Sequence, residues 1–182
     1  YNLLMMDFSE NMIATAAENV PEAESHKVRL VNTNFYTYGF EEDQFDLVMA
    51  VGILAHVHDP MMFLRRISRL VKPGGKLIIQ NTNAAASFTY LIRGQQWLKR
   101  MLGKTNYKLN WLSERELLRS LRNEGLELQQ SFRYHQSWLG FSHLFSNEAK
   151  YEKTIKAFGT ADNPRNQSTG SDVMYLLNKT SH

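Results

Sequence analysis

One histidine follows directly on the most apolar strand-like stretch of the chain. Residues 45–51 are almost continuously hydrophobic, and Gly52 and His56 come just after them. An imidazole titrates near neutral pH, so His56 has the chemistry to accept a proton from a hydroxyl or an amine. Ligands of open α/β sheets bind beyond the carboxyl ends of the strands. The position of His56 therefore predicts a small-molecule site after this strand.

Two further strand-like runs are flanked by residues that suit ligand binding. The apolar run 2–6 is followed by the acid Asp7, and the turn sequence Lys-Pro-Gly-Gly at residues 72–75 leads into the apolar run 77–79. Three strands with such loops predict a nucleotide-like cofactor lying across the end of a sheet.

The elements that position these residues alternate between strand and helix. We predict strands at residues 2–6, 28–31, 45–51 and 77–79, the third being apolar on both faces and so covered by helices on both sides. Ser9 and Asp59 are N-cap residues of helices that end at Pro21 and at Pro73-Gly74. This alternation implies parallel strands with right-handed crossovers. The predicted fold is α/β, with a doubly wound, mostly parallel sheet.

The second half of the chain has a different pattern. Residues 84–102 are predicted to form an amphipathic helix, and Ser113 with Glu116 forms a capping box that opens a helix ending at Gly125. Strands follow at residues 126–133 and 173–177, with a helix and a mobile loop between them.

Length and composition limit the class of protein. The 182 residues fit a single domain, residues 1–182, and 43% of them are hydrophobic. With no cysteine, disulfides, a cysteine-ligated zinc and a cysteine nucleophile are excluded. No apolar run is long enough to span a membrane and no signal peptide is visible, so a cytoplasmic location is expected. A net charge of +3 permits an acidic partner without requiring nucleic acid.

Several of these segments resemble a known family. The Phe-Asp-x-Val strand at residues 45–48 and the Lys-Pro-Gly-Gly turn at residues 72–75 are similar to those of class I S-adenosylmethionine-dependent methyltransferases. The resemblance is closest to the small-molecule and lipid methyltransferases. It covers residues 3–81, with a looser match over residues 112–133. It implies S-adenosylmethionine as the cofactor, a small-molecule acceptor and no metal.

The sequence departs from this family in two places. The family has a glycine-rich loop, an acid followed by Gly-x-Gly, just before the strand that corresponds to residues 2–6, and this sequence lacks it. We expect this loop and the first strand to lie upstream of Tyr1. Asn34 stands where the family often has an acid, and its side-chain carbonyl can still accept a hydrogen bond from an adenine amino group.

The resemblance assigns cofactor contacts to residues of the first third of the chain. Asp7 would accept hydrogen bonds from both ribose hydroxyls, Phe8 and Met12 would pack against the adenine, and Asn34 and Phe35 would flank its edge. Each residue also has a purely structural alternative. Asp7 and Asn34 are typical turn residues, and Met12 and Phe35 are typical core residues.

The remaining candidates follow the third strand. Val51 and Gly52 would contact the cofactor, since a glycine lets the backbone come close to a ligand; the alternative is a turn glycine. His56 would contact the acceptor, either as the catalytic base or only at the rim of the pocket. His58 is expected to be a loop residue.

Residues 84–111 are predicted to form a helical lid over the acceptor. The aromatic residues of this region would suit a ring, a lipid or a sugar, and they are Tyr90, Trp97, Tyr107 and Trp111. Packing of the helix on the body of the domain is the alternative, and we expect it for Trp97. The basic residues of the same region form either a solvated face or a site for a phosphate or carboxylate.

The predicted activity is methyl transfer from S-adenosylmethionine to oxygen, nitrogen or carbon of a small molecule by in-line displacement. The first alternative is a nucleic-acid (RNA) methyltransferase, which the sequence Val51-Gly52-Ile53-Leu54 opposes, because enzymes that methylate base amines have an Asn/Asp-Pro-Pro-aromatic motif there. The second alternative is a non-catalytic binding module, which the missing glycine-rich loop would permit. The oligomeric state is left open.

Overall fold

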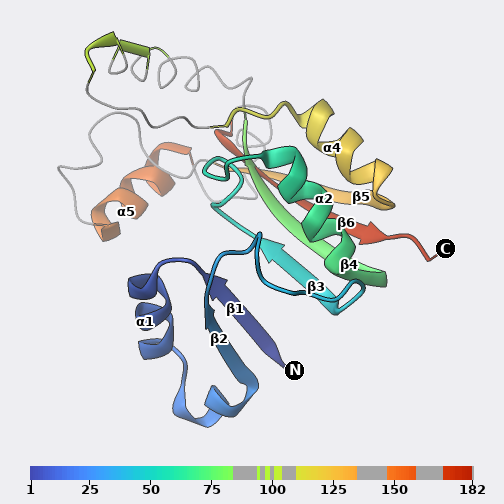
Figure 1. The fold of residues 1–182 in the computed structure, drawn as a ribbon. Coiled ribbons are helices and arrows are strands. Elements are labelled where there is room, and N and C mark those ends of the chain that lie inside the picture. The colour runs from blue at the N-terminus through green and yellow to red at the C-terminus, as the bar shows by residue number, and fades with distance from the viewer. Residues whose placement is uncertain are drawn as a thin grey trace. The chain divides into compact units, whose positions relative to one another are not determined.

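The computed structural model contains two compact units, Tyr1–Glu41 (unit 1) and Glu42–His182 (unit 2), each with its own sheet (Figure 1). The residues that the structure describes are 1–83, 94, 97–98, 101–103, 110–134, 147–158 and 170–181. In this part of the chain, no helix has the length and hydropathy needed to cross a bilayer.

Unit 1 is a pair of parallel strands joined by helices. Strand β1 (Leu3–Asp7) pairs with β2 (Val28–Asn32), so that Asp7 lies opposite Asn32. Both strands lie within one residue of their predicted bounds. Helix α1 (Glu10–Glu18) begins after Ser9, whose Oγ accepts a hydrogen bond from the Met12 amide at 3.4 Å, which confirms the predicted cap. The helix ends earlier than predicted, and the 3-10 helix η1 (Glu22–Lys27), which was not predicted, leads into β2.

Unit 2 contains a four-stranded sheet in the order β3-β4-β6-β5. Its strands are β3 (Phe45–Ala50), β4 (Val71–Thr82), β5 (Leu126–Tyr134) and β6 (Asp172–Lys179). Strands β3 and β4 are parallel, whereas β6 lies between β4 and β5 and is antiparallel to both. The parallel pairs confirm the α/β architecture. The central, antiparallel position of the last strand was not predicted.

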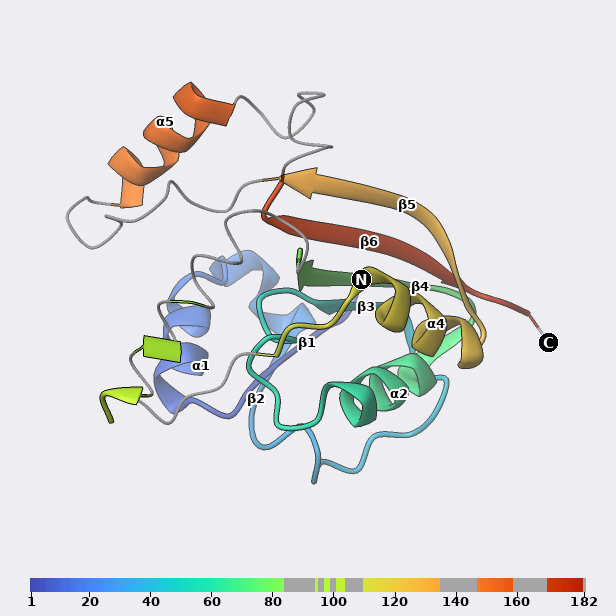
Figure 2. The same ribbon diagram turned by 90° about the horizontal axis from the view of Figure 1, so that it is seen from above.

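Strand β3 is more exposed than its sequence predicts. Among the described residues its one neighbouring strand is β4, and Leu47 and Met49 are 48% and 60% exposed, while Ala50 is buried. In the described part of unit 2, helices α2 (Pro60–Leu70) and α4 (Glu114–Asn123) cover one face of the sheet (Figure 2), and helical coverage of the second face of β3 remains a prediction.

Helix α2 (Pro60–Leu70) begins as predicted, since Asp59 Oδ1 accepts a hydrogen bond from the Met62 amide at 2.9 Å. The helix ends at Leu70, three residues before Pro73. The amides of Asp43 and Gln44 donate to the carbonyl oxygens of Arg69 and Leu70 at 2.8 and 3.0 Å, which satisfies acceptors at the helix end. The Lys-Pro-Gly-Gly sequence consequently belongs to β4.

Helix α4 (Glu114–Asn123) has the predicted capping box. Ser113 Oγ accepts from the Glu116 amide at 3.3 Å, and Glu116 Oε2 accepts from the Ser113 amide at 3.1 Å. The helix ends two residues before Gly125, which has a φ of +78°. Helix α5 (Asn147–Phe158) falls within the segment predicted to hold a helix, and most of the predicted helix 84–102 lies outside the described residues.

Helices α2 and α4 lie on the same face of the unit 2 sheet (Figure 2). Between them and the strands is a layer of side chains that are at most 2% exposed: Phe63, Leu64, Ile67, Leu77, Ile79, Leu117, Leu121, Leu126, Val173, Tyr175 and Leu177. Each buried aliphatic side chain contributes about 1.5–3 kcal/mol to folding. This apolar layer gives the carboxyl ends of β3 and β4 a rigid support.

Candidate functional site

In unit 1, Asp7 lies at the carboxyl end of β1. Its Oδ1 accepts a hydrogen bond from the Ser9 amide at 2.8 Å, and its backbone oxygen accepts from the Thr33 amide and from Asn32 Nδ2 at 3.1 and 3.2 Å. Within the described residues, Oδ2 has no hydrogen-bond donor. Asp7 therefore has the turn role that was its structural alternative, and it retains a carboxylate oxygen for a ligand.

Phe8 and Met12 expose apolar surface close to Asp7 in the sequence. Their side chains are 84% and 57% exposed, and α1 buries none of its residues. The structural alternative for Met12, packing in the core, is therefore not what unit 1 shows. Contact with an adenine ring remains a prediction for both residues.

Asn34 and Phe35 form the turn after β2. Asn34 Oδ1 accepts a hydrogen bond from the Tyr36 amide at 2.9 Å, an arrangement typical of asparagine turns. The half-buried Phe35 ring lies 5.7 Å from the rings of both Tyr36 and Phe40, measured between centroids. The turn alternative is therefore present for Asn34, whereas Phe35 is only half-buried and is not a core residue, and a role at the adenine edge remains a prediction for both.

In unit 2, Gly52 begins the loop that follows β3. Its φ is +72°, a conformation that side chains strongly disfavour, and its amide donates to Gln80 Oε1 at 2.9 Å. Among the described residues, no atom apart from those of Gly52 and its two chain neighbours lies within 4 Å of the position that a Cβ would occupy. Together with the half-exposed Val51, this position offers accessible backbone at the carboxyl end of a parallel strand.

The middle of the same loop is held by Asn110. Its Nδ2 donates to the carbonyl oxygens of Val57 and Leu54 at 2.5 and 3.3 Å, and its amide donates to the carbonyl oxygen of Ala55 at 2.9 Å. Leu54 is buried beneath the loop with 1% exposure. These contacts fix the backbone on both sides of His56.

His56 lies on the exposed side of this loop. Its amide donates to the carbonyl oxygen of Ile53 at 2.9 Å, and its side chain is exposed, as is that of His58. His56 is therefore accessible to a ligand. Its role as a base or as a substrate contact remains a prediction.

Sequence reasoning missed the polar residues that support this loop. Gln80 Nε2 donates to Asp172 Oδ1 at 3.1 Å, and Ser171 Oγ donates to Asp172 Oδ2 at 2.8 Å. A local signal existed for Gln80, because the apolar run 77–79 turns polar there. Nothing local connects Gln80 with a residue 92 positions away.

Tyr134 lies opposite Asp172 in the β5–β6 register. Burial, with a further contribution from the nearby Asp172 carboxyl, raises the pKa of Tyr134 to about 12. Tyr134 consequently keeps its proton at physiological pH and can serve only as a neutral hydrogen-bonding group.

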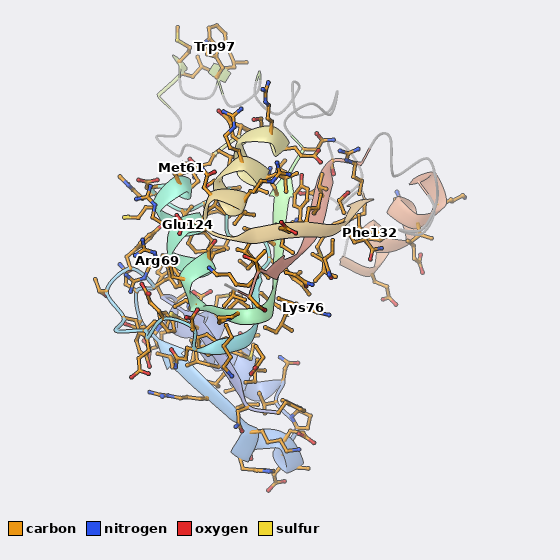
Figure 3. All side chains as sticks on the ribbon, turned by 90° about the vertical axis from the view of Figure 1, so that its right-hand side faces the viewer. Met61, Arg69, Lys76, Trp97, Glu124 and Phe132 are labelled. Atoms are coloured by element: carbon orange, nitrogen blue, oxygen red, sulfur yellow. The ribbon has the colours of Figure 1, made fainter. Side chains whose placement is uncertain are left out.

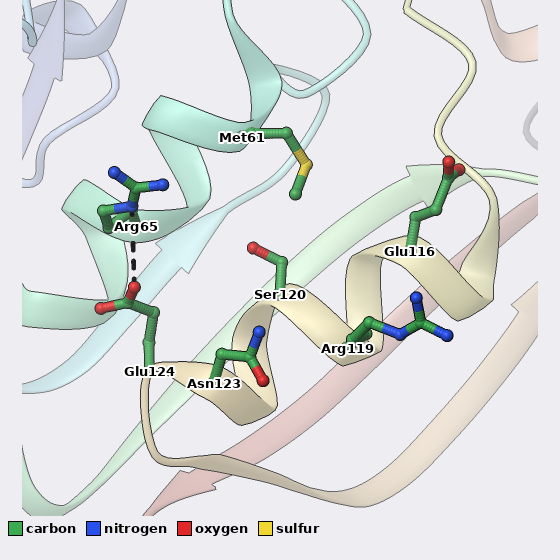
Figure 4. Close-up of a pocket in the computed structure, with 7 residues that line it drawn as sticks. All are labelled: Met61, Arg65, Glu116, Arg119, Ser120, Asn123 and Glu124. Carbon is green, nitrogen blue, oxygen red and sulfur yellow. Dashed lines mark ion pairs between the residues drawn. The ribbon is translucent and has the colours of Figure 1, made fainter.

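A separate groove of about 270 Å³ lies between α2 and α4 (Figure 4). Arg65 Nε lies 3.7 Å from Glu124 Oε1 in this groove, and Arg69 Nε lies 3.8 Å from the other carboxylate oxygen of Glu124 (Figure 3). The lining residues are Met61, Arg65, Glu116, Arg119, Ser120, Asn123 and Glu124. None of these lining residues is a predicted site residue.

Within the predicted lid, the structure describes residues 94, 97–98, 101–103 and 110–111. Trp97 is 64% exposed (Figure 3), so the expected packing of its side chain against the body of the domain is wrong. Trp111 is half-buried, whereas Tyr90, Tyr107 and the basic residues of this region lie outside the described residues. The lid itself, residues 84–111, remains a prediction. Across the described ranges, no three His, Asp or Glu residues gather as metal ligands do.

Comparison with known proteins shows that the first part of the chain is similar to methyltransferases. Residues 1–79 match a family model described as a methyltransferase domain. A ubiquinone biosynthesis O-methyltransferase from Xanthomonas euvesicatoria is 34% identical over 105 residues, which are 56% of this chain and 44% of that protein. A demethylmenaquinone methyltransferase from Listeria welshimeri is 40% identical over 78 residues, which are 43% of this chain and 33% of that protein. Both matches span less than half of the relative's length.

Solved structures support the fold over the whole chain. A putative methyltransferase from Bacillus halodurans has a TM-score of 0.67 at 14% identity, covering 99% of this chain and 84% of that one. An S-adenosylmethionine-dependent methyltransferase from Mesorhizobium loti has a TM-score of 0.64 at 15% identity, covering 98% and 80%. The family match over residues 1–79 and the two relatives support the resemblance to methyltransferases in that part of the chain, and the solved structures show the same fold over nearly all of it.

Proposed function

We propose that this protein transfers a methyl group from S-adenosylmethionine to a small-molecule acceptor. The observation that carries the proposal is Asp7, an acid at the carboxyl end of a parallel strand with one carboxylate oxygen left for a ligand among the described residues. Acids at this position bind ribose hydroxyls in related nucleotide-binding folds. The methyltransferase-domain match includes Asp7 and the loop of His56.

The residues present fit an adenosyl cofactor. In unit 1, Asp7 would bind the ribose, and the exposed side chains of Phe8 and Met12 would contact the adenine, with Asn34 and Phe35 at its edge. In unit 2, Val51 and Gly52 are both exposed and would contact the cofactor through their backbone. When bound, the cofactor supplies an electrophilic methyl group on a sulfonium centre.

The role proposed for the protein is mainly alignment. Holding two reactants in line lowers the barrier by about 7–11 kcal/mol in favourable cases. The loop fixed by Gln80 and Asn110 would present His56 to the acceptor, where its imidazole would take the proton that a hydroxyl loses on methylation.

For the acceptor, we infer a ring that carries a hydroxyl or a reactive carbon. The two relatives quoted above are named for ubiquinone and menaquinone methylation, and such rings would suit aromatic side chains such as the exposed Trp97. Nucleic acid is not the expected acceptor. A cytoplasmic location is part of the same proposal.

Two measurements test the proposal. Calorimetry should detect binding of S-adenosylmethionine and of S-adenosylhomocysteine, and an assay with radiolabelled cofactor should show transfer to members of a panel of catechols and hydroxylated quinols. A folded protein that binds neither cofactor form would contradict the proposal. Binding without transfer to any acceptor would instead favour a non-catalytic module.

A further inference from the structure

A chain of hydrogen-bonded polar groups runs from the exposed Gly52, just after β3, to buried side chains of β4 and of the start of β6. The Gly52 amide donates to Gln80 Oε1 at 2.9 Å, Gln80 Nε2 donates to Asp172 Oδ1 at 3.1 Å, and Ser171 Oγ donates to Asp172 Oδ2 at 2.8 Å. The side chains of Gln80, Ser171 and Asp172 belong to residues that are each 5% exposed. Such groups cannot exchange one lost partner for bulk water, so the chain is stable only when it is complete.

The direction of these hydrogen bonds allows only one orientation of the Gln80 side-chain amide. A backbone amide can only donate, so the oxygen of the Gln80 side chain must face Gly52. Its amino group must then face Asp172, whose carboxyl accepts on both oxygens. Asp172 thus determines which way Gln80 points, and Gln80 determines where the Gly52 amide is held.

We propose that Gln80, oriented by Asp172, is a positioning residue that fixes the Gly52 peptide at the cofactor-binding end of β3. Gly52 has no side chain to anchor it, and among the described residues no atom beyond its chain neighbours lies within 4 Å of where its Cβ would be, so the hydrogen bond to Gln80 replaces the packing that would hold another residue. Gln80 acts through Gly52 and does not touch the cofactor. The inference rests on the proposed function in that Gly52 is taken to contact the cofactor.

The neighbouring residue Asn81 provides a matched control. It is also 5% exposed, and its Nδ2 donates to the carbonyl oxygen of Leu112 at 2.8 Å. Because side chains alternate along a strand, Asn81 lies on the opposite face of β4 from Gln80. An Asn81→Ala variant therefore removes one buried amide and one hydrogen bond and leaves the hydrogen bond between Gly52 and Gln80 in place.

The decisive variants exchange donors for acceptors. Gln80→Glu keeps the size of the side chain and the acceptor for Gly52, but it places a second carboxyl against Asp172. The pair can then hold together only by sharing a proton, which is lost as the pH rises. Adding Asp172→Asn should restore the contacts with positions 80 and 171, because the amide introduced at position 172 donates to the carboxylate introduced at position 80 and its oxygen accepts from Ser171. The Asp172 carboxyl also contributes to the raised pKa of Tyr134, so Tyr134 is one titratable group that responds to a change at position 172.

Two readouts are followed from mildly acidic to mildly alkaline pH: hydrogen exchange of the Gly52 amide by NMR, and cofactor affinity by calorimetry. For Gln80→Glu we expect faster Gly52 exchange and at least tenfold weaker cofactor binding at alkaline pH, with recovery at acidic pH. The paired variant should return to within about threefold of the wild type at all pH values. Asn81→Ala should change neither readout.

Unchanged Gly52 exchange in Gln80→Glu would overturn the proposal, and so would faster exchange with unchanged cofactor affinity. If Gln80→Glu does not fold, Gln80→Met replaces it, because it keeps the length of the side chain and removes both hydrogen bonds. A wild-type protein that binds no cofactor would contradict the proposed function, and the Gly52 exchange would then decide alone whether Gln80 holds this peptide.

Discussion

The side-chain amide of Asn110 donates a hydrogen bond to the carbonyl oxygen of Val57 at 2.5 Å, across 53 positions of sequence. A second bond to Leu54 and a backbone bond to Ala55 complete a brace around the loop of His56. The geometry of the proposed acceptor contact therefore depends on a residue at the carboxyl-terminal end of the predicted lid region, residues 84–111.

Replacing Asn110 by alanine should slow methyl transfer more than it weakens cofactor binding. The substitution removes the bonds to Leu54 and Val57 and leaves His56 on a looser loop, and a small displacement of reacting groups lowers the rate by about tenfold or more. Single-turnover rates and calorimetry measure the two effects. Asn123→Ala, at an exposed position of α4, is the control. An unchanged rate would show that the brace has no role in the reaction.

Asp7→Asn should weaken cofactor binding about tenfold or more, because hydrogen bonds to a charged group contribute about 1.5–3 kcal/mol each. Stability should change little, since the asparagine oxygen can still accept from the Ser9 amide. Calorimetry and urea unfolding separate the two effects. Asp46→Asn removes an exposed carboxylate that is paired with Lys72 and should leave affinity unchanged. Equal affinity of Asp7→Asn and wild type would remove Asp7 from the site.

Two glycines should respond differently to alanine. At Gly52 the added methyl group meets open space, so the cost is the strain of a positive φ, about 1–2 kcal/mol, with weaker cofactor binding. At Gly75 the methyl would lie 2.9 Å from the carbonyl oxygen of Lys72 and 3.0 Å from that of Asp46, so unfolding free energy should fall by about 1–3 kcal/mol. Urea unfolding and calorimetry of both variants compare these effects. Cofactor affinity that is unchanged in Gly52→Ala would argue against a contact there.

The capping box of α4 should make stability depend on pH. Hydrogen bonds from the side chain and the amide of Ser113 lower the pKa of Glu116 below its usual 4.5. The stabilisation that the ionised Glu116 carboxylate gives to the folded state is fully present above pH 4.5, and it is lost as the pH falls through the lowered folded-state pKa. The difference in unfolding free energy between wild type and Glu116→Gln should therefore shrink in that acidic range. Ser113→Ala should abolish the same pH dependence, and a difference that persists at acidic pH would contradict the assignment.

Leu117→Ala should lower the unfolding free energy of unit 2 by about 2–5 kcal/mol, since the side chain is completely buried between α4 and the sheet. Leu128 is 41% exposed on β5, and its replacement by alanine should cost clearly less. Chemical denaturation of both variants provides the comparison. Equal losses would mean that the apolar layer does not dominate stability.

The sequence predicted best what local chemistry determines. The caps at Ser9, Asp59 and Ser113 were confirmed because each depends on residues three or four positions apart. The end of α2 was placed too late, because its last carbonyls bind amides of the preceding loop, which no helix pattern encodes. The antiparallel insertion of β6 was missed for a similar reason, since strand order depends on contacts between distant segments.

In the candidate site, too, the residues that local sequence marks could be predicted, and those that depend on distant contacts could not. Asp7, Gly52 and His56 could be named because each follows an apolar strand directly. Their supports, Gln80 with Asp172 and Asn110, could not be found, because polar residues in one segment give no indication of which distant backbone they meet. The structure thus adds the residues that support the site, and the chemical roles of Asp7, Gly52 and His56 remain predictions.

The place of β6 also affects how the protein is made. Strand β4 pairs with β6, which follows it by about ninety residues in the sequence, as the pairing of Thr82 with Asp172 shows. Strand β5 also pairs with β6. During synthesis, neither can complete its ladder until residue 179 has left the ribosome. Pairing across such distances is slow, because a long chain segment must close first. We therefore expect nascent chains that stall before β6 to need chaperones that shield their unpaired strands. A premature stop at the same place would remove the strand that joins β4 to β5.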